Sequence, residues 1–210
     1  MKIGIAALIG TAVALGACGG GNNASNTADT TAAEAPPAAA PAAAPAGSTA
    51  AAPAPQGPMS MPAWMKVDKA KKTVSLDIHA GKTPDNNHWN FNGYYKGNAT
   101  ITVPQGYKVT IKFTNDDPSL AHSIGVDSAY TTFPATFTNP QPIFSGAISS
   151  DPTDPTKATQ PTKSGTVTFT ADKAGSYTLN CFIPGHAMSG MWIHFDVSSD
   201  GKAGVQTSAS

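Results

Sequence analysis

Alternation of apolar and polar residues dominates the second half of the chain. A period of two places successive side chains on opposite faces of a strand, so each alternating segment predicts a half-buried β-strand. Turns are expected at 104–107 and 172–175, where Pro, Gly and Asp gather. No long stretch has helical periodicity, so the pattern predicts an all-β sandwich or barrel. The six alternating segments, all rich in Val, Ile, Thr and aromatic residues, are 73–79, 98–103, 108–115, 165–171, 175–181 and 191–197.

These strands predict one folded domain at residues 61–199. Between 128 and 164 the chain is rich in Pro, Thr and Asp, so this part is expected to form large loops. A short strand is expected at 122–127, and the apolar segment at 142–147 is a candidate for another. The final residues, 200–210, are small and polar and are expected to form a disordered tail.

Residues 1–17 are interpreted as a lipoprotein-type signal peptide. They combine Lys2 with an apolar run and small residues, and they are too short for a transmembrane helix, which needs roughly 20 apolar residues. The ending LGAC resembles the lipobox of bacterial lipoproteins, in which Cys18 becomes the lipidated first residue. The alternative is ordinary secretion with Cys18 discarded. Lipidation would place the protein in a bacterial periplasm or at the cell surface, tethered to a membrane.

Residues 18–60 are low in complexity, with repeated Ala and Pro and almost no large apolar side chain. Such a segment cannot bury enough apolar surface to offset the entropy of ordering. We therefore expect a disordered linker, kept extended by its prolines. Met59, Met61 and Met65 follow or end it, and we interpret them as part of a strand that packs on the domain rather than as a copper-loading segment.

The charges argue against a nucleic-acid-binding function. The chain has 13 Lys and Arg against 13 Asp and Glu, a formal net charge of zero, and its positive residues are scattered. A nucleic-acid binder would show a basic excess or patch. With lipid on Cys18, the second cysteine, Cys181, has no disulfide partner. A lone thiol in an oxidising compartment is expected to be buried or bound to metal.

Segment 181–192, CFIPGHAMSGMW, gathers a thiol, an imidazole and two thioethers. Cys181 ends one expected strand, Met191 opens the next, and His186 lies on the loop between them. Sulfur and imidazole ligands suit copper, and two His, one Cys and a weak axial Met form the site of blue copper electron carriers. The alternative is a core thiol without metal. Met188 rivals Met191 as a ligand, but it would have to fold back sharply.

Such a site needs a second histidine, and we favour His122 because it lies beside a loop at the start of an expected strand. Ser123 could donate a hydrogen bond to the Cys181 sulfur, or it could bond only to backbone. Trp192 is expected to be a core residue. The other three histidines are less suitable. His79 lies far upstream, His88 lies in a polar run expected to be exposed, and His194 lies in the middle of an expected strand.

Segments 91–115, 121–126 and 181–192 contain FNGYY…FTN, AHSIGV and the Cys followed by GHAMSGMW. Together they resemble the cupredoxins and, within that superfamily, the sulfocyanins, which are blue copper proteins related to rusticyanin. The resemblance implies a Greek-key cupredoxin β-sandwich with one type 1 copper ion per chain. The family's ligands carry over to His122, Cys181, His186 and Met191.

The resemblance also implies one-electron transfer rather than an enzymatic activity with a small-molecule substrate. Known sulfocyanins work in respiratory chains, so redox partners such as a cytochrome or a terminal oxidase are expected. His186, between small and apolar neighbours, is the expected point of electron exchange. The alternative function is a copper carrier or storage protein, which normally exposes its ligands. A copper enzyme would need a further copper site, often built from His-x-His pairs, and the sequence contains no such pair.

Overall fold

The computed structural model describes residues 53–208, all within one compact unit, Pro45–Ser210. The expected signal peptide (1–17) and Cys18 lie outside the described residues, as does most of the expected linker. Within the described range, no helix is long and apolar enough to cross a membrane. The regular elements are β1 (Met65–Asp68), β2 (Thr73–Ala80), the short 3-10 helix η1 (Asp85–His88), β3 (Ala99–Pro104), β4 (Lys108–Asn115), β5 (Gly125–Ser128), β6 (Ser164–Thr170), β7 (Gly175–Asn180), β8 (Trp192–Ser198) and β9 (Gly204–Thr207).

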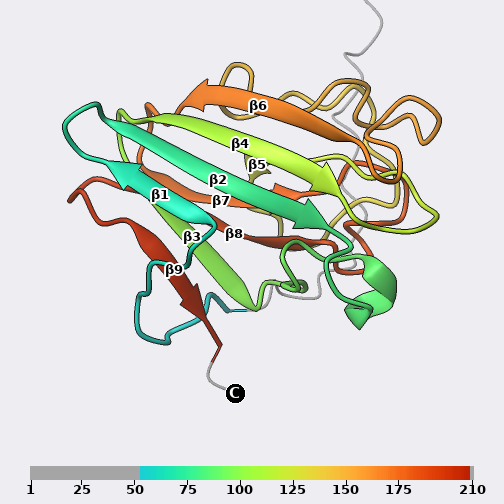
Figure 1. Cartoon of the computed structure of the whole chain (residues 1–210), viewed down its shortest axis with the longest axis horizontal. Coiled ribbons are helices and arrows are strands. Elements are labelled where there is room, and N and C mark those ends of the chain that lie inside the picture. The colour runs from blue at the N-terminus through green and yellow to red at the C-terminus, as the bar shows by residue number, and fades with distance from the viewer. Residues whose placement is uncertain (1–52, 209–210) are drawn as a thin grey trace, which may run out of the picture. The chain divides into compact units, whose positions relative to one another are not determined.

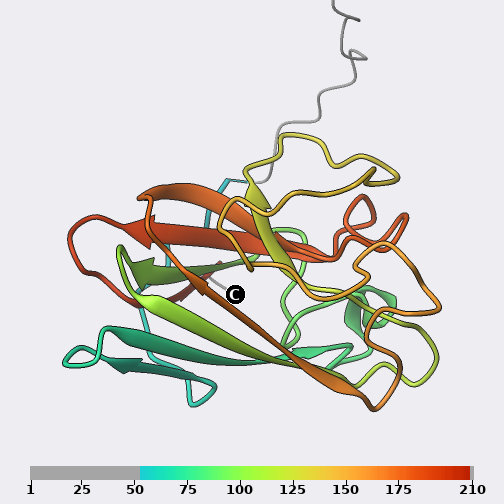
Figure 2. The ribbon, with the colours of Figure 1, turned by 90° about the horizontal axis from the view of Figure 1, so that it is seen from above.

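The strands form two sheets that lie as two layers around a shared core (Figures 1 and 2). One sheet has the order β1-β2-β4-β6 and the other the order β5-β7-β8-β3-β9. β2 pairs with β4 in parallel, as β3 does with β8, and the other pairs are antiparallel. Because β2 and β3 follow each other in the chain but lie in different sheets, the chain crosses between the layers. The arrangement confirms the expected all-β sandwich.

All six alternating segments are strands, β2, β3, β4, β6, β7 and β8, and their bounds differ from the expected ones by at most one residue. In β4, Val109, Ile111 and Phe113 are fully buried, whereas the residues between them are exposed or half-buried. Burying each such side chain stabilises the fold by about 1.5–3 kcal/mol. β3 is buried at every position, and β8 and β9 pair with its two edges.

The expectation of a disordered tail at 200–210 is wrong, because β9 pairs with β3 along its length. The expected disordered linker, 18–60, also ends too late. The Ser60 backbone exchanges two hydrogen bonds of 2.9 and 2.8 Å with the Val205 backbone. The folded domain therefore extends beyond 61–199 at both ends.

The chain between β4 and β6 contains less strand than expected. β5 begins at Gly125 rather than at residue 122, and segment 142–147 is not a strand. His122 instead makes an isolated pair with Thr159, with backbone hydrogen bonds of 3.0 and 3.1 Å. The rest of 128–164 forms loops, as predicted.

These loops contribute a second apolar cluster. Phe133 and Phe137 pack with Phe182, Ala187 and Trp192, which all belong to the segment 181–192. The prediction that Trp192 is a core residue is therefore confirmed, although it packs beneath the loops rather than between the sheets. The cluster covers the sequence segment that holds the candidate ligands.

The final strand provides a test of the corrected domain boundary. Val205 is 2% exposed and pairs with both β3 and Ser60. Replacing Val205 by Ala should lower the free energy of unfolding by about 2 kcal/mol, since it removes buried methyl groups and leaves a cavity. Chemical denaturation measures this, and Ser208→Ala, at an exposed neighbour, is the control that should change stability by less than about 0.5 kcal/mol. Equal stability of the two variants would show that β9 is not part of the folded domain.

Candidate metal centre

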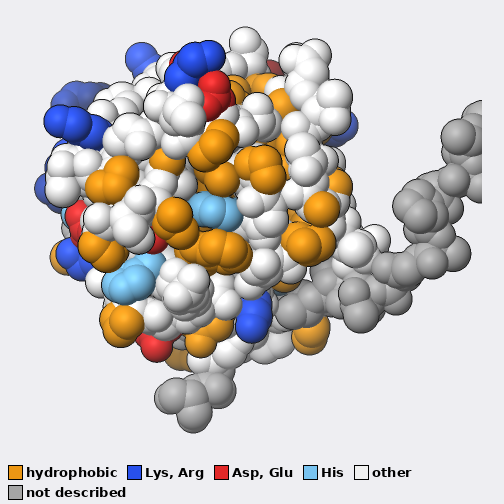
Figure 3. Space-filling model, turned by 90° about the vertical axis from the view of Figure 1, so that its right-hand side faces the viewer, with side chains coloured by type: hydrophobic (Ala, Val, Ile, Leu, Met, Phe, Trp, Pro, Cys, Tyr) orange, Lys and Arg blue, Asp and Glu red, His pale blue; other side chains and the backbone are white. Residues whose placement is uncertain are grey.

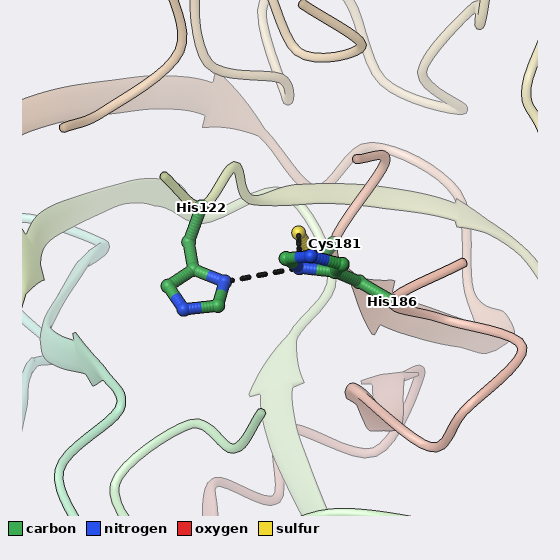
Figure 4. A group of neighbouring side chains, drawn as sticks. All are labelled: His122, Cys181 and His186. Carbon is green, nitrogen blue, oxygen red and sulfur yellow. Dashed lines mark hydrogen bonds between the residues drawn. The ribbon is translucent and has the colours of Figure 1, made fainter. Parts of the chain in front are cut away.

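One thiol and two imidazoles converge at the end of the sandwich where β4 and β7 end (Figure 4). The Nδ1 atoms of His122 and His186 lie 3.2 Å apart. The Cys181 Sγ atom lies 3.5 Å from His186 Nδ1, and one ligand atom from each of the three residues falls within 4.8 Å of the others. The structure thus brings together the three residues predicted from the sequence.

The loop between β7 and β8 positions two of these groups through its own backbone. Cys181 N–H donates to the Met191 carbonyl (3.1 Å), and Met191 N–H donates to the His186 carbonyl (2.9 Å). Gly185 turns the chain with a φ of +83°, a conformation that glycine adopts without steric cost. Its N–H donates to the Ala135 carbonyl (2.8 Å), which ties the turn to the long loop region.

The two methionines of the segment differ in environment. Met191 is fully buried, and its backbone bonds to both Cys181 and His186. Met188 is 57% exposed. Burial and these backbone contacts favour Met191 over Met188 as a fourth ligand.

The spacing of the ligand atoms fits a small metal ion. Bonds of about 2.0 Å to His nitrogen and about 2.3 Å to thiolate sulfur, the values for zinc, place ligand atoms about 3.3–3.7 Å apart in trigonal or tetrahedral sites. The separations of 3.2 and 3.5 Å are close to that range. A Cys, two His and a buried Met are soft and borderline donors, and this set selects copper over magnesium or calcium.

Ser123 contacts the Cys181 sulfur in two ways. Its backbone N–H donates to Sγ at 3.4 Å, and its hydroxyl oxygen lies 3.6 Å from Sγ. The same oxygen accepts a hydrogen bond of 2.8 Å from the Phe182 N–H, which leaves the hydroxyl proton free to point at sulfur. The backbone and sulfur contacts that the sequence left as alternatives therefore occur together.

Asp117 is a site residue that the sequence analysis missed. Its Oδ2 atom lies 2.9 Å from His122 Nε2, the ring nitrogen that faces away from His186. Asp117 is 2% exposed and His122 is fully buried. The Asp-Pro pair at 117–118 signals a turn, but a turn signal does not reveal which side chain the carboxylate will meet.

Trp89 is the second residue that was missed. Its ring stacks on His186, with centroids 4.3 Å apart and an interplanar angle of 19°. Asn86, Asn87 and His88, which precede it, all have positive φ, at 48°, 59° and 63°, and such conformations cost roughly 1–2 kcal/mol per residue. His88 itself is half-buried rather than exposed as expected. The strained turn holds the indole against the imidazole.

The remaining histidines stay outside the site, as predicted. His79 binds Asp116 through Nδ1 at 2.7 Å and lies 3.5 Å from Asp77. His88 Nδ1 lies 3.3 Å from the Gly81 carbonyl, and His194 is at the middle of β8. The converging group of described residues contains none of them.

Burial keeps the thiol and the two imidazoles of the site uncharged near pH 7. Burial, and to a smaller extent the nearby His122, lowers the pKa of His186 to about 4, although Asp117 opposes the shift. Burial also lowers the pKa of His122, although Asp117 opposes this. Burial raises the pKa of the Cys181 thiol, which the hydrogen bonds from Ser123 only partly offset. Both imidazoles are therefore neutral near pH 7, with lone pairs available to a metal.

The environment of Asp117 has the opposite effect. Burial alone would raise its pKa, but hydrogen bonds from the Ser119 N–H, His122 and the Leu120 N–H outweigh burial and hold the pKa below its usual value. Asp117 is therefore a carboxylate inside the protein.

Two sequence comparisons point to one protein family. A family model described as "Sulfocyanin (SoxE) domain" matches residues 60–206. The sulfocyanin of Sulfolobus acidocaldarius is 33% identical over 129 residues, which are 59% of this chain and 62% of that protein. The chain thus spans less than two thirds of the length of this relative.

Several solved structures are similar to this chain at lower sequence identity. Rusticyanin from Thiobacillus ferrooxidans is 23% identical, with a TM-score of 0.40, over 64% of this chain and 86% of that chain. A reduced auracyanin from Roseiflexus castenholzii is 23% identical, with a TM-score of 0.41, over 59% of this chain and 96% of that chain. A multicopper oxidase is 23% identical, with a TM-score of 0.37, over 54% of this chain and 32% of that chain.

The low pKa of His186 predicts that the metal-free protein loses stability in acid. Between about pH 4 and 6.5 the unfolded chain binds a proton on this imidazole and the folded chain does not. Stability is therefore full above pH 6.5 and falls as the pH drops toward 4, by about 3 kcal/mol for this group. Denaturation of the metal-free protein across this range measures the loss.

His186→Gln is the matched variant, because glutamine does not titrate. The difference in unfolding free energy between wild type and this variant should change by about 3 kcal/mol between pH 7 and pH 4. A difference that stays constant with pH would contradict the assigned environment of His186.

Proposed function

Since the chain belongs to the sulfocyanin family of blue copper proteins, within the cupredoxin superfamily, we propose that it carries single electrons through a type 1 copper site. The single observation that carries the proposal is the convergence of a buried cysteine sulfur with two histidine Nδ1 atoms. The residues that would hold the copper are His122, Cys181, His186 and the buried Met191. Bound copper supplies the electron-transfer chemistry, by alternating between Cu(II) and Cu(I).

The residues of the chain prepare the site before any metal binds. Cys181 and His186 are held by one closed loop, and His122 is fixed by its backbone pair with Thr159. Trp89 and the aromatic cluster around Phe182 exclude water from two sides. A site that is already in place changes little when an electron arrives, and this favours rapid transfer.

We assign electron exchange to the surface next to His186. This residue is 5% exposed, while Met188 and Leu120, each two positions from a histidine ligand, are 57% and 39% exposed. Figure 3 shows hydrophobic side chains gathered around histidine on the end of the sandwich toward which β2 and β4 run. An apolar surface of this kind suits brief docking of a redox protein.

The wider role rests on the sequence and the family. We propose that the protein is exported to a bacterial periplasm or cell surface and tethered by lipid on Cys18. Its partners would be redox proteins of a respiratory chain, such as a cytochrome or a terminal oxidase. The linker sequence would give the domain reach from the membrane to these partners.

The alternative is a copper carrier or storage protein. Exchange of the metal would require ligands that a partner can reach, yet Cys181, His122 and Met191 are fully buried. Their burial favours a metal that stays bound while electrons pass. An enzymatic role would need further copper ligands or a substrate site in addition to His122, Cys181, His186 and Met191. We therefore propose an electron carrier without enzymatic activity.

The copper protein and its Cys181→Ser variant test the proposed function directly. The wild-type chain loaded with Cu(II) should show intense thiolate-to-copper absorption in the visible range, which ascorbate bleaches reversibly. The variant should lack this absorption, because serine offers no thiolate. A colourless wild type, or colour that survives in the variant, would exclude a copper–thiolate site. Loss of the metal on each reduction would favour the alternative, a copper carrier or storage protein.

The docking surface generates a further prediction. Met188→Lys should slow electron self-exchange between Cu(I) and Cu(II) copies about tenfold, which corresponds to roughly 1.4 kcal/mol, because both copies would present a charge at an apolar contact. NMR line broadening in mixtures of the two oxidation states measures the rate.

Met61→Lys is the matched control, since Met61 is 52% exposed and lies beside Asp200 and Lys202, which follow the opposite end of β8. This variant should exchange electrons at the wild-type rate. Equal rates for both variants would place the docking surface elsewhere.

A further inference from the structure

A buried carboxylate lies behind one of the two imidazoles, and neither the ligand motif nor the family assignment gives it a role. We propose that Asp117 is an internal counter-charge of the copper centre, which orients His122 through Nε2 and lowers the reduction potential of the metal. This inference rests on the proposed copper function. It makes Asp117 a positioning residue, because it acts through His122 rather than on the metal itself.

The contacts of Asp117 are those of an ionised group with no cation beside it. Oδ1 accepts hydrogen bonds from the Ser119 N–H (2.8 Å), the Leu120 N–H (2.9 Å) and the Ser119 hydroxyl (3.3 Å), while Oδ2 faces His122 Nε2 at 2.9 Å. Among the ion pairs of the described residues, each lysine pairs with a different carboxylate, and His122 is the partner of Asp117. The negative charge therefore acts toward the metal site.

This arrangement selects one form of His122. A carboxylate accepts but does not donate, so the ring proton must lie on Nε2. Nδ1 is then left without a proton, and it is the nitrogen that points toward His186. Carboxylates that hold ligand histidines in this way fix the tautomer and raise the basicity of the ligand.

The charge also distinguishes the two oxidation states. The Cys181 thiolate and the Asp117 carboxylate together balance Cu(II), but they leave one excess negative charge when the ion becomes Cu(I). An unbalanced charge is unfavourable in the low-dielectric interior. Asp117 therefore stabilises Cu(II) relative to Cu(I), which corresponds to a lower reduction potential than a neutral residue would give.

The backbone around Asp117 is built to hold it in place. Its N–H donates to Asn115 Oδ1 (2.9 Å), and the Asp116 N–H donates to the Ala80 carbonyl at the end of β2 (2.8 Å). Gly81, with a φ of +68°, packs so closely that a Cβ atom there would lie 2.7–2.8 Å from the N, Cα and Cβ atoms of Asp117. The end of β2 thus clamps the bend that carries the carboxylate.

Asp117→Asn and Asp116→Asn, compared in the copper-loaded protein, provide the test. Both variants remove one carboxylate charge, but Asp116 is partly exposed and pairs with His79 and Lys82. Asp117→Asn should weaken Cu(II) binding by 10–100-fold, the usual cost of losing such a partner, and should weaken Cu(I) binding less. If the ratio of the two affinities changes tenfold, voltammetry should record a rise in potential of about 59 mV.

The thiolate-to-copper absorption separates this inference from the proposed function. If the wild type lacks that absorption, the copper function itself fails. If both variants keep it and Asp117→Asn shifts the potential and the affinity ratio no more than Asp116→Asn, the counter-charge role of Asp117 is overturned.

A measurement on the wild type covers the case in which Asp117→Asn does not fold. Long-range proton–nitrogen NMR of the Cu(I) protein should show the His122 proton on Nε2, and the carbon shift of the Asp117 carboxyl should be that of an ionised group. A His122 without an Nε2 proton, or a protonated Asp117, would overturn the inference.

Discussion

The structure depends on holding a thiol and two imidazoles, all buried, at one point where two sheets end. Burying such groups without partners is costly, so their approach to 3.2 and 3.5 Å has to be imposed by the surrounding fold. The antiparallel pairing of β7 with β8 does this for two of them, because it fixes both ends of the loop that carries Cys181 and His186. The third is brought in by β4 and by the pair that His122 makes with Thr159.

The sequence predicted those features that are local or periodic. Alternation located six strands to within one residue, and the spacing of Cys181, His186 and Met191 identified the loop. The sequence pattern did not predict β9, because β9 has only one large apolar residue, Val205, and therefore no alternation to detect. Its strand conformation depends on pairing with β3. The position of Ser60 could not be predicted for the same reason, since it depends on backbone hydrogen bonds with Val205 in β9.

Asp117 and Trp89, which contact the two histidines, could not be predicted from the sequence, because their contacts depend on how distant segments of the chain meet in the fold. Trp89 reaches His186 only because the connection after β2 folds back across the end of the sandwich. Asp117 is near His122 in sequence, yet its orientation depends on the close approach of Gly81, which directly follows β2. The parallel pairing of β2 with β4 places Ala80 beside Asn115, so the segments that carry Trp89 and Asp117 both begin at the same end of this sheet. Such pairing joins segments that are far apart in the chain, and no local pattern reports it.

The two imidazoles consequently have different surroundings. His122 contacts the buried Asp117 carboxylate through Nε2, and its backbone pairs with Thr159, so both the ring and the backbone are held by the interior. His186 is backed by an aromatic face and lies on the loop that also carries the exposed Met188. The connection that begins at Gly81 supports both, through the clamp on Asp117 and through the strained turn before Trp89. In the proposed function electrons enter beside His186, while the opposite side of the site, at His122, is fixed by Asp117 and by the pair with Thr159. Docking of a partner beside His186 therefore need not move His122.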